Sequence, residues 1–226
     1  MNYQKLQRLS KLAVHHGEYI KDDDGKTIGF EYTPERIKLH NKIIKKLTTN
    51  AICIKQDTPV AVLMGGAPAS GKSTFLKKNA AYMQSDKIWK VDADEVREML
   101  PEYNGWNSAA THEESRDIVK QLLDNYDKPC KHDLLFDGTM ANPRKYKPII
   151  KNLKKQGYKV FIAYMEIPKD VSIKRALDRY RNNNSGDAKW GRYVPILVIK
   201  EFFENGDQGF QQIKKLVDGY VKIDSL

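Results

Sequence analysis

A glycine-rich stretch carries the clearest chemistry in the sequence. Residues 66–74 read Gly-Ala-Pro-Ala-Ser-Gly-Lys-Ser-Thr, which fits the pattern G-x-x-x-x-G-K-[ST] in full. Glycines permit unusual backbone angles, so successive amide N–H groups can point inward and form a nest for phosphate oxygens. Lys72 would place its ammonium between the β- and γ-phosphates of a nucleoside triphosphate, and the hydroxyl of Ser73 can bind Mg²⁺. The candidate nucleotide-binding residues are Gly66, Ala67, Pro68, Ala69, Ser70, Gly71, Lys72, Ser73 and Thr74.

Two carboxylates follow the next predicted strand. That strand is expected over residues 88–91, and Asp92 and Asp94 come directly after it. Ligands of open parallel sheets bind at the carboxyl ends of strands, and we expect this strand to neighbour the one that leads into the glycine-rich stretch. Asp94 would open a short helix, so Arg97 would lie one turn further along the same face, where the pair could hold an acceptor hydroxyl group. The alternative is that Asp94 is only a helix cap and Arg97 only its solvated partner.

A third carboxylate ends another apolar run. Residues 134–136 predict a strand that runs into Asp137-Gly138, which resembles strands whose final Asp supports Mg²⁺ through water. The alternative is an ordinary turn, because Asp-Gly pairs are common in turns. With the hydroxyl of Ser73, the carboxylates of Asp92 and Asp137 are the predicted ligands of Mg²⁺.

Cations that could stabilise a transferring phosphoryl group come late in the chain. Several basic residues lie on the helix predicted over residues 168–182, and Arg192 follows a polar loop. An arginine-bearing helix followed by a flexible segment is typical of a lid that closes over a triphosphate, and Arg179 and Arg192 are the candidate catalytic arginines. The alternative is a basic helix face exposed to solvent.

The order of the predicted elements favours an α/β fold. Residues 60–64 form a continuous apolar run, which is typical of a strand buried on both faces of a parallel sheet. Further strands are predicted at 88–91, 134–136, 160–164 and 221–223, and helices at 72–83, 94–100, 111–126, 143–156, 168–182 and 195–204. This alternation predicts three layers, with helices on both faces of a mostly parallel central sheet.

The N-terminal part lacks this alternation. A short strand is predicted at 28–32, and a helix begins at Thr33-Pro34, with Ile37, His40, Ile43, Ile44 and Leu47 on one face. We therefore interpret residues 1–32 as an appendage and residues 33–226 as one catalytic domain. His15 and His16 are expected to be exposed polar residues.

Composition adds weaker constraints. The chain has 226 residues, a formal net charge of +10 and a pI near 9.3, which would suit a polyanionic partner or only a lysine-rich surface. Cys53 and Cys130 are far apart in sequence, so neither a disulfide framework nor a zinc site that includes His132 is expected. No apolar run is long enough for a membrane helix and no signal sequence is evident, so we expect a cytoplasmic protein.

Taken in order, these motifs resemble the zeta toxin family over roughly residues 32–203. The matching segments are residues 66–74, the stretch Val-Asp-Ala-Asp-Glu-Val-Arg-Glu-Met-Leu-Pro-Glu-Tyr at 91–103, His-Glu-Glu-Ser at 112–115, Asp-Gly-Thr at 137–139 and Gly-Arg-Tyr-Val-Pro at 191–195. The resemblance implies a P-loop NTPase fold with an arginine-bearing helical lid. It also implies a kinase that uses ATP or GTP with Mg²⁺ to phosphorylate a sugar hydroxyl of UDP-N-acetylglucosamine, with an antitoxin protein as partner.

The resemblance also assigns roles to individual residues. Lys72 would bind phosphate, Asp94 would be the catalytic base, and Arg179 and Arg192 would clamp the phosphates. Asp137 and Thr139 would help to bind the substrate, in a position where family members often have Glu-Gly-Thr, so Asp137 departs from the usual Glu. Asp117 on the long helix would contact the sugar.

A second, weaker resemblance is to the kinase domain of phage polynucleotide kinases. There the acceptor is a 5′-hydroxyl of nucleic acid, a partner that the net charge would suit. Asp94 and Arg97 keep the same roles under either resemblance. A third possibility is a degenerate relative that binds nucleotide without catalysis, although a pure binding module has no need of a base at Asp94.

Overall fold

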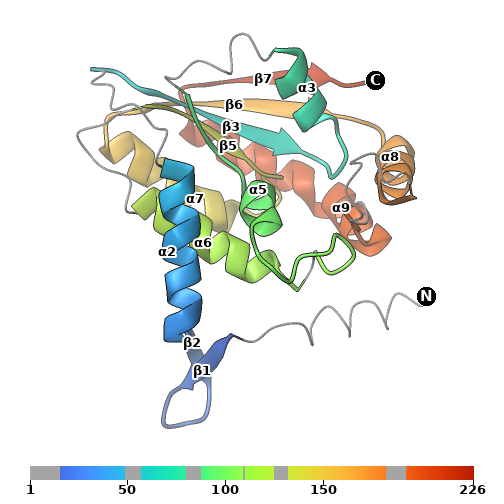
Figure 1. Ribbon diagram of the computed structural model, residues 1–226. Coiled ribbons are helices and arrows are strands. Elements are labelled where there is room, and N and C mark those ends of the chain that lie inside the picture. The colour runs from blue at the N-terminus through green and yellow to red at the C-terminus, as the bar shows by residue number, and fades with distance from the viewer. Residues whose placement is uncertain (1–15, 49–56, 80–87, 109, 125–131, 182–191) are drawn as a thin grey trace. The chain divides into compact units, whose positions relative to one another are not determined.

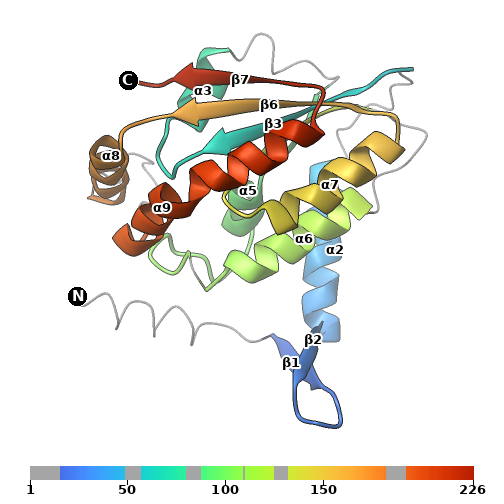
Figure 2. The same cartoon turned by 180° about the vertical axis from the view of Figure 1, so that it is seen from behind.

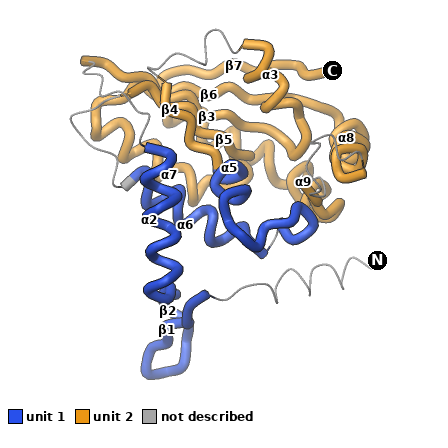
Figure 3. Tube along the Cα trace, in the orientation of Figure 1, with its two compact units in different colours: residues 1–51, 93–125 blue, residues 52–92, 126–226 orange. Residues whose placement is uncertain are grey.

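The computed structural model describes residues 16–48, 57–79, 88–108, 110–124, 132–181 and 192–226. The chain divides into two compact units (Figure 3): unit 1 comprises residues 1–51 and 93–125, and unit 2 comprises residues 52–92 and 126–226. The chain therefore leaves unit 2 directly after Asp92 and returns to it at Tyr126. The predicted appendage at residues 1–32 stays a prediction, and the two cysteines lie outside the described residues.

Unit 2 is built on a five-stranded parallel sheet. Its strands are β3 (Val60–Gly66), β4 (Ile88–Val91), β5 (Asp133–Asp137), β6 (Lys159–Glu166) and β7 (Gly219–Asp224), in the spatial order β4-β5-β3-β6-β7. All four pairings are parallel, so the carboxyl ends of the strands lie along one edge. The predicted fold class is confirmed. One detail is wrong: β4 does not neighbour β3, because β5 lies between them.

Helices cover both faces of this sheet (Figures 1 and 2). Helices α7 (Pro143–Lys155) and α9 (Ile196–Ile213) lie together on one face, and α3 (Lys72–Lys78) lies on the other. Phe210 of α9 stacks on Tyr164 of β6 with 4.3 Å between the ring centroids. Helix α8 (Lys169–Arg181) follows β6, and a short 3-10 turn, η1 (Lys214–Leu216), connects α9 to β7.

The hydrophobic core follows from the apolar strands. Ala61, Leu63 and Met64 of β3 have no exposed surface, as the continuous apolar run predicts for a central parallel strand. Phe75 and Leu76 of α3 pack against the cluster that contains Met64, so the helix that follows the glycine-rich stretch is anchored in the core.

Several boundaries differ from the sequence prediction. Helix α3 ends at Lys78 with Asn79 as its C-cap, earlier than the predicted Met83. Helix α9 continues to Ile213 instead of stopping at Glu204, and both glycines within it are closely packed: Gly206 against the side chain of Phe202 and Gly209 against a segment outside the helix. A Cβ at Gly209 would lie 2.6 Å from the backbone oxygen of Met140, a separation at which atoms clash.

The described residues of unit 1 form a hairpin and three helices. Strands β1 (Gly17–Lys21) and β2 (Thr27–Tyr32) pair antiparallel, and the sequence analysis missed β1. Helix α2 (Pro34–Thr48) follows, and Thr33 caps it by accepting from the amide of Arg36 at 3.3 Å. Helices α2 and α5 (Ala93–Glu98) both pack against α6 (His112–Asp124).

The buried face of α2 agrees with the predicted one except near its start. His40 and Ile43 are buried and Ile44 and Leu47 partly buried, as predicted, whereas Ile37 is 45% exposed. The charged Arg36, which the apolar pattern did not include, is buried beside them. Across the described residues, no helix is long and apolar enough to cross a membrane.

We predict that Gly209→Ala destabilises the protein. Alanine favours a helix by about 1 kcal/mol over glycine, but the new methyl group would press on the backbone of Met140 and Ala141. The expected net loss in the free energy of unfolding is about 1–3 kcal/mol, measured by chemical denaturation. The exposed neighbour Gln208→Ala is the control, with an expected change within about 0.5 kcal/mol. An equal effect of the two substitutions would contradict the close packing.

Candidate phosphate-binding and phosphoryl-transfer site

The phosphate loop (residues 66–74) connects β3 to α3. Gly66 has φ 125° and Gly71 has φ 89°, so both adopt angles that favour glycine. Ala69, at φ 55°, is a non-glycine residue in the left-handed region. A side chain at Gly66 would also collide with the backbone oxygen of Met165 at 2.4 Å. The two glycines of the motif are therefore required by backbone geometry.

The amides at the start of α3 form the predicted nest. Gly71 is the N-cap, and no side chain caps the helix. Within the described parts of the chain, the backbone N–H groups of Gly71, Lys72 and Ser73 have no backbone acceptor. Unsatisfied amides at a helix N-terminus attract anions, and a phosphate group can satisfy several of them at once.

Lys72 lies in the centre of the phosphate loop. Its ammonium donates to the carbonyl oxygens of Gly66 at 3.3 Å and Ala67 at 3.1 Å, and to the hydroxyl of Ser70 at 3.4 Å. Burial lowers the pKa of Lys72 below the ordinary value for lysine, and Arg192 and Arg179 act in the same direction. Asp137 opposes this shift in the pKa of Lys72. A polyanion next to Lys72 would stabilise its charged form.

Asp92 and Asp137 lie at the same level of the sheet. Val91, the last residue of β4, pairs with Phe136 of β5, so the next residues of the two strands, Asp92 and Asp137, are side by side. Asp137 also pairs with Met64 of β3. Burial raises the pKa of Asp137, and Asp92 raises it further, while Lys72 acts in the opposite direction. Asp92 forms an ion pair with Lys90 at 3.0 Å. The two predicted metal ligands on neighbouring strands are thus close enough to influence each other.

The surroundings of one carboxylate oxygen of Asp137 indicate whether Mg²⁺ fits at this site. Oδ1 of Asp137 is buried and has no hydrogen-bond partner among the described residues. A buried, unsatisfied carboxylate oxygen is costly, and a cation or its bound water would satisfy it. Mg²⁺ commonly binds one or two carboxylates and completes its shell with water and substrate phosphates, so Asp137, Asp92 and the hydroxyl of Ser73 suit it. Three or more His, Cys, Asp or Glu side chains do not gather as a metal cage anywhere in the described parts.

The two candidate arginines belong to the same electrostatic neighbourhood. Burial lowers the pKa of Arg192, and Asp92 partly offsets that effect. Arg179 is in α8, and both arginines are close enough to affect Lys72. The structure therefore brings together Lys72, Asp92, Asp137, Arg179 and Arg192 in unit 2. The predicted lid loop at residues 182–188 lies outside the described residues.

Thr139 connects the end of β5 to the phosphate loop. Its carbonyl oxygen accepts from the amide of Gly66 at 3.3 Å, and the amide of Gly138 donates to Met64 at 3.2 Å. The hydroxyl of Thr139 accepts from the amide of Ala141 at 3.4 Å. The segment after β5 thus continues the pairing with β3, which holds Asp137 and Thr139 beside the loop. Its role in substrate binding stays a prediction.

Asp94 and Arg97 form a pair within unit 1. Arg97 Nη1 donates to Asp94 Oδ1 at 2.7 Å, and Arg97 Nη2 lies 2.9 Å from Nδ1 of His112 at the start of α6. Arg97 is only 2% exposed, whereas the side chain of Asp94 is 37% exposed. This geometry favours a role for Arg97 in orienting Asp94, and its predicted contact with substrate stays a prediction.

Asp117, the predicted sugar contact, accepts a hydrogen bond from the hydroxyl of Tyr32. The distance between Tyr32 Oη and Asp117 Oδ2 is 2.7 Å, and this bond links α6 to the hairpin. Burial raises the pKa of Tyr32 above its ordinary value, and the hydrogen bond to Asp117 adds to the shift. Asp117 therefore has a structural partner, and its role in substrate binding stays a prediction.

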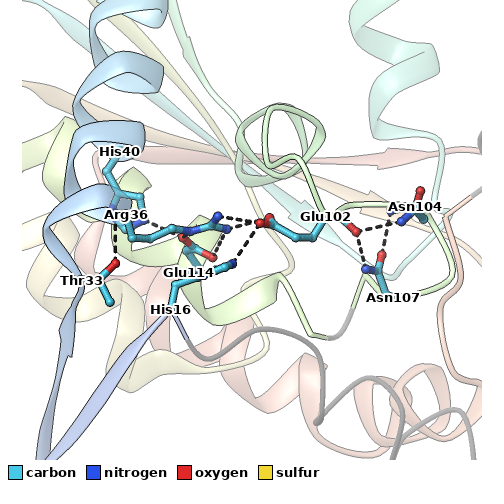
Figure 4. A network of polar contacts seen from close by, with 8 residues as sticks. All are labelled: His16, Thr33, Arg36, His40, Glu102, Asn104, Asn107 and Glu114. Carbon is cyan, nitrogen blue, oxygen red and sulfur yellow. Dashed lines mark hydrogen bonds and ion pairs between the residues drawn. The ribbon is translucent and has the colours of Figure 1, made fainter.

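The sequence analysis missed an ion cluster in unit 1 (Figure 4). It consists of His16, Arg36, His40, Glu102 and Glu114. Arg36 forms two hydrogen bonds to Glu102, at 2.8 and 2.9 Å, and also donates to Glu114 through Nε and through Nη2, the latter at 2.8 Å. His16, expected to be an exposed polar residue, instead contacts Glu102 at 3.0 Å.

This cluster ties four separate segments together. His40 Nε2 lies 2.7 Å from Glu114 Oε1, so α2 is joined to α6, while Glu102 joins both to the loop after α5. Asn104 and Asn107 donate to the backbone oxygen of Glu102 at 3.0 and 2.7 Å. The only sign of this cluster in the sequence is that the charged residue Arg36 lies one helical turn before His40. The carboxylate partners of Arg36 are more than sixty residues away in the sequence.

Comparison with known proteins places the chain in a family. The family model described as Zeta toxin matches residues 44–224, which is most of the sequence. The chain belongs to the zeta toxin family. The predicted family resemblance is thus confirmed.

Among curated zeta toxin relatives, the chain is 26% identical to Toxin PezT of Streptococcus pneumoniae serotype 4 over 144 residues. That match covers 61% of this chain and 55% of PezT, so the chain matches about half of the length of this relative.

Solved structures show the same fold. The PezAT chromosomal toxin–antitoxin system of the human pathogen Streptococcus pneumoniae superposes with a TM-score of 0.65 at 20% identity, covering 86% of this chain and 79% of that one. AvrRxo1-ORF1:-ORF2 with ATP gives a TM-score of 0.64 at 16% identity, covering 99% and 68%. The Pnkp1/Rnl/Hen1 RNA repair complex gives a TM-score of 0.51 at 16% identity, covering 70% and 47%.

Because the ion cluster depends on ionised carboxylates, we predict that acid destabilises the fold. The hydrogen bond from Arg36 lowers the pKa of Glu102 from an ordinary 4.5 to about 2, although burial acts in the other direction. Burial would raise the pKa of Glu114, but hydrogen bonds from His40 and Arg36 outweigh it and lower that pKa. Because the folded state binds these protons less tightly than the unfolded state, the stabilisation is complete above the ordinary pKa and disappears as the pH falls toward about 2.

Glu102→Gln tests this contribution. We expect the variant to lose about 1–3 kcal/mol of unfolding free energy at neutral pH, and to depend less on pH than the parent in acid. Denaturant unfolding at a series of pH values measures both effects. Glu113→Gln, which removes an exposed ion pair to Arg116, should leave the pH dependence unchanged. Parallel curves for the parent and Glu102→Gln would show that the cluster does not carry the effect.

Proposed function

We propose that this zeta toxin family protein is a kinase that transfers the γ-phosphate of ATP, or of GTP, to a hydroxyl group of a nucleotide sugar similar to UDP-N-acetylglucosamine. One observation carries the proposal: the phosphate loop, Lys72, two strand-end carboxylates and Arg192 gather at one edge of the sheet of unit 2. Such a set supplies the amides, cations and metal ligands that phosphoryl transfer requires.

The nucleotide side of the reaction follows from unit 2. The amides of the phosphate loop and the ammonium of Lys72 would bind the β- and γ-phosphates. Mg²⁺, held by Ser73 with Asp92 and Asp137, would neutralise charge on the transferring group when bound. Arg179 and Arg192 would stabilise the negative charge that spreads over the equatorial oxygens in the transition state.

The acceptor side of the reaction depends on Asp94. Asp94 is two residues beyond Asp92, so covalent geometry limits the separation of their α-carbons to about 7 Å. The carboxylate of Asp94 would take the proton of the acceptor hydroxyl, and the hydroxyl oxygen would attack the γ-phosphorus. At the same time the bond from the γ-phosphorus to the bridging oxygen would break, and the nucleoside diphosphate would leave. Arg97 would hold the carboxylate in orientation through its 2.7 Å hydrogen bond. Asp117, Asp137 and Thr139 are the proposed contacts to the acceptor.

The family supports the choice of acceptor and partner. The Zeta toxin family model matches residues 44–224, a range that contains Asp94, and PezAT is a toxin–antitoxin system. We therefore propose a cytoplasmic location and an antitoxin protein as partner.

A nucleic-acid acceptor is the second candidate, and one observation favours it. Helix α7 contains six basic residues and no acidic residue, and its exposed cations recur every three or four positions. They are Arg144, Lys147, Lys151, Lys154 and Lys155. Three basic residues near the N-terminus of this helix oppose the helix dipole, which is unfavourable unless an anion is nearby. A row of cations of this kind could follow a phosphate backbone.

The decisive assay supplies γ-labelled ATP and Mg²⁺ with either UDP-N-acetylglucosamine or 5′-hydroxyl oligonucleotides. We expect label on the nucleotide sugar. Label on the oligonucleotide alone would replace the first proposal by the second. Absence of label on both acceptors, with ATP still bound, would favour the noncatalytic nucleotide-binding module.

Asp94→Asn should reduce kcat by at least about a hundredfold while the affinity for ATP changes little, because the amide cannot accept the proton. Glu98→Gln, an exposed carboxylate on the same helix, is the matched control and should keep nearly full activity. Steady-state kinetics and ATP titration measure the two quantities. If Asp94→Asn turns over as fast as the parent, another group is the base.

A further inference from the structure

Two serine hydroxyls from distant parts of the chain contact the phosphate loop from outside. Ser172 in α8 donates to the carbonyl oxygen of Pro68 at 2.7 Å, and Ser225, just after β7, donates to the carbonyl oxygen of Ser70 at 2.6 Å. Both distances lie within the normal range for O–H···O hydrogen bonds. Neither serine belongs to the motif of residues 66–74.

Each contact fixes the orientation of one peptide unit. A peptide unit is planar and trans, so its C=O and N–H point in opposite directions. If the Pro68 carbonyl is held outward by Ser172, the amide of Ala69 must point inward. In the same way, the bond from Ser225 to the Ser70 carbonyl turns the amide of Gly71 inward, toward the position of phosphate.

The loop needs such support because its backbone can adopt other conformations. Ala69 has φ 55°, which is unfavourable for a residue with a side chain, and glycine at 71 is free to flip. A Cβ at Gly71 would meet no atom closer than 3.7 Å, so packing around this glycine does not lock the backbone. Hydrogen bonds to the flanking carbonyls supply the missing constraint.

The two serines are themselves held in place. Ser172 is fully buried, and its amide donates to Pro168 at 3.0 Å. The amide of Ser225 donates to Glu166 at 3.2 Å, and its carbonyl accepts from Arg175 Nη2 at 3.0 Å. The end of β6, the end of β7 and helix α8 therefore all converge on the outer side of the loop.

We propose that Ser172 and Ser225 are positioning residues that preset the phosphate loop for binding the triphosphate. This inference rests on the proposed function, because it assumes that the loop binds phosphates. It concerns the amides of Ala69 and Gly71, and neither serine is proposed to touch the substrate.

The test uses the full chain and inorganic tripolyphosphate with Mg²⁺, a probe that reports on the loop without any acceptor. Ser225→Ala and Ser172→Ala should each weaken tripolyphosphate binding by about fivefold, measured by titration calorimetry, because each removes one net hydrogen bond from the bound conformation. Ser225→Thr keeps the hydroxyl and should bind within about twofold of the parent. The double alanine variant should lose about twenty-fivefold, since each serine fixes a different peptide unit.

Kinetics separate positioning from general stability. The alanine variants should raise KM for ATP about fivefold and change kcat by less than about twofold. Thr48→Val is the control: among the described residues, the hydroxyl of Thr48 bonds within α2, to the carbonyl oxygens of Ile44 at 2.9 Å and Lys45 at 3.2 Å, so its loss should leave tripolyphosphate binding unchanged. If Ser172→Ala does not fold, the comparison of Ser225→Ala with Ser225→Thr still decides the proposal.

The outcomes distinguish this inference from the proposed function. Parent-like tripolyphosphate binding by both alanine variants would overturn the positioning role and leave the kinase proposal intact. Binding lost in Ser225→Ala and restored in Ser225→Thr would support the role even if no acceptor were phosphorylated. A parent protein that does not bind tripolyphosphate would overturn both.

Discussion

The site depends on the burial of opposite charges at one edge of a parallel sheet. Burial makes the charged form of Lys72 and of Arg192 less favourable, and it does the same to Asp137. The carboxylates offset only part of this cost, and Oδ1 of Asp137 lacks a partner within the described residues. A triphosphate would place negative charge beside Lys72 and Arg192, and its metal ion would place positive charge beside Asp137. The parallel sheet makes this arrangement possible, because it ends β3, β4 and β5 at the same edge.

Unit 1 also contains buried charges, which belong to its ion cluster. Its ion cluster buries Arg36 and satisfies the guanidinium with two carboxylates, so helices and hairpin are held by directed hydrogen bonds in addition to apolar packing. Breaking one partner of such a buried set is costly, because the remaining charge is left without compensation. Arg97 is likewise a buried guanidinium held by side-chain contacts, one with Asp94 and one with His112. The proposed base thus accepts a hydrogen bond from a buried arginine.

Much of unit 2 could be predicted from the sequence because local signals and the global fold agree. Apolar runs mark the buried strands, and the motif around Lys72 demands a strand before it and a helix after it. The sheet order could not be predicted, since nothing near residues 88–91 records that β5 separates β4 from β3. The predicted helix 195–204 stops short of Gly206 and Gly209, and the close approach of the backbone at Met140 and Ala141, which explains Gly209, is visible only in the fold.

The misses in unit 1 have a common physical cause. Arg36 and Glu114 are charged residues that sequence patterns assign to solvent, and their burial depends on partners far away in the chain. Likewise, Ser172 and Ser225 resemble ordinary polar residues until the fold brings them to the phosphate loop. The residues of the motif itself were found, because their chemistry requires a fixed spacing, whereas their supporting contacts require only proximity.

The distance in sequence between Ser70 and Ser225 affects the order in which the parts of the site can fold during synthesis. These residues are 155 positions apart, so the ribosome makes the phosphate loop long before it makes the strand that ends beside it. Because β7 pairs with β6 at the edge of the sheet, the outer support of the loop is assembled only after β7 has been made. A nascent chain would therefore carry the complete nucleotide motif without its final geometry, and competence to bind nucleotide would be acquired only once β7 had emerged and joined the sheet.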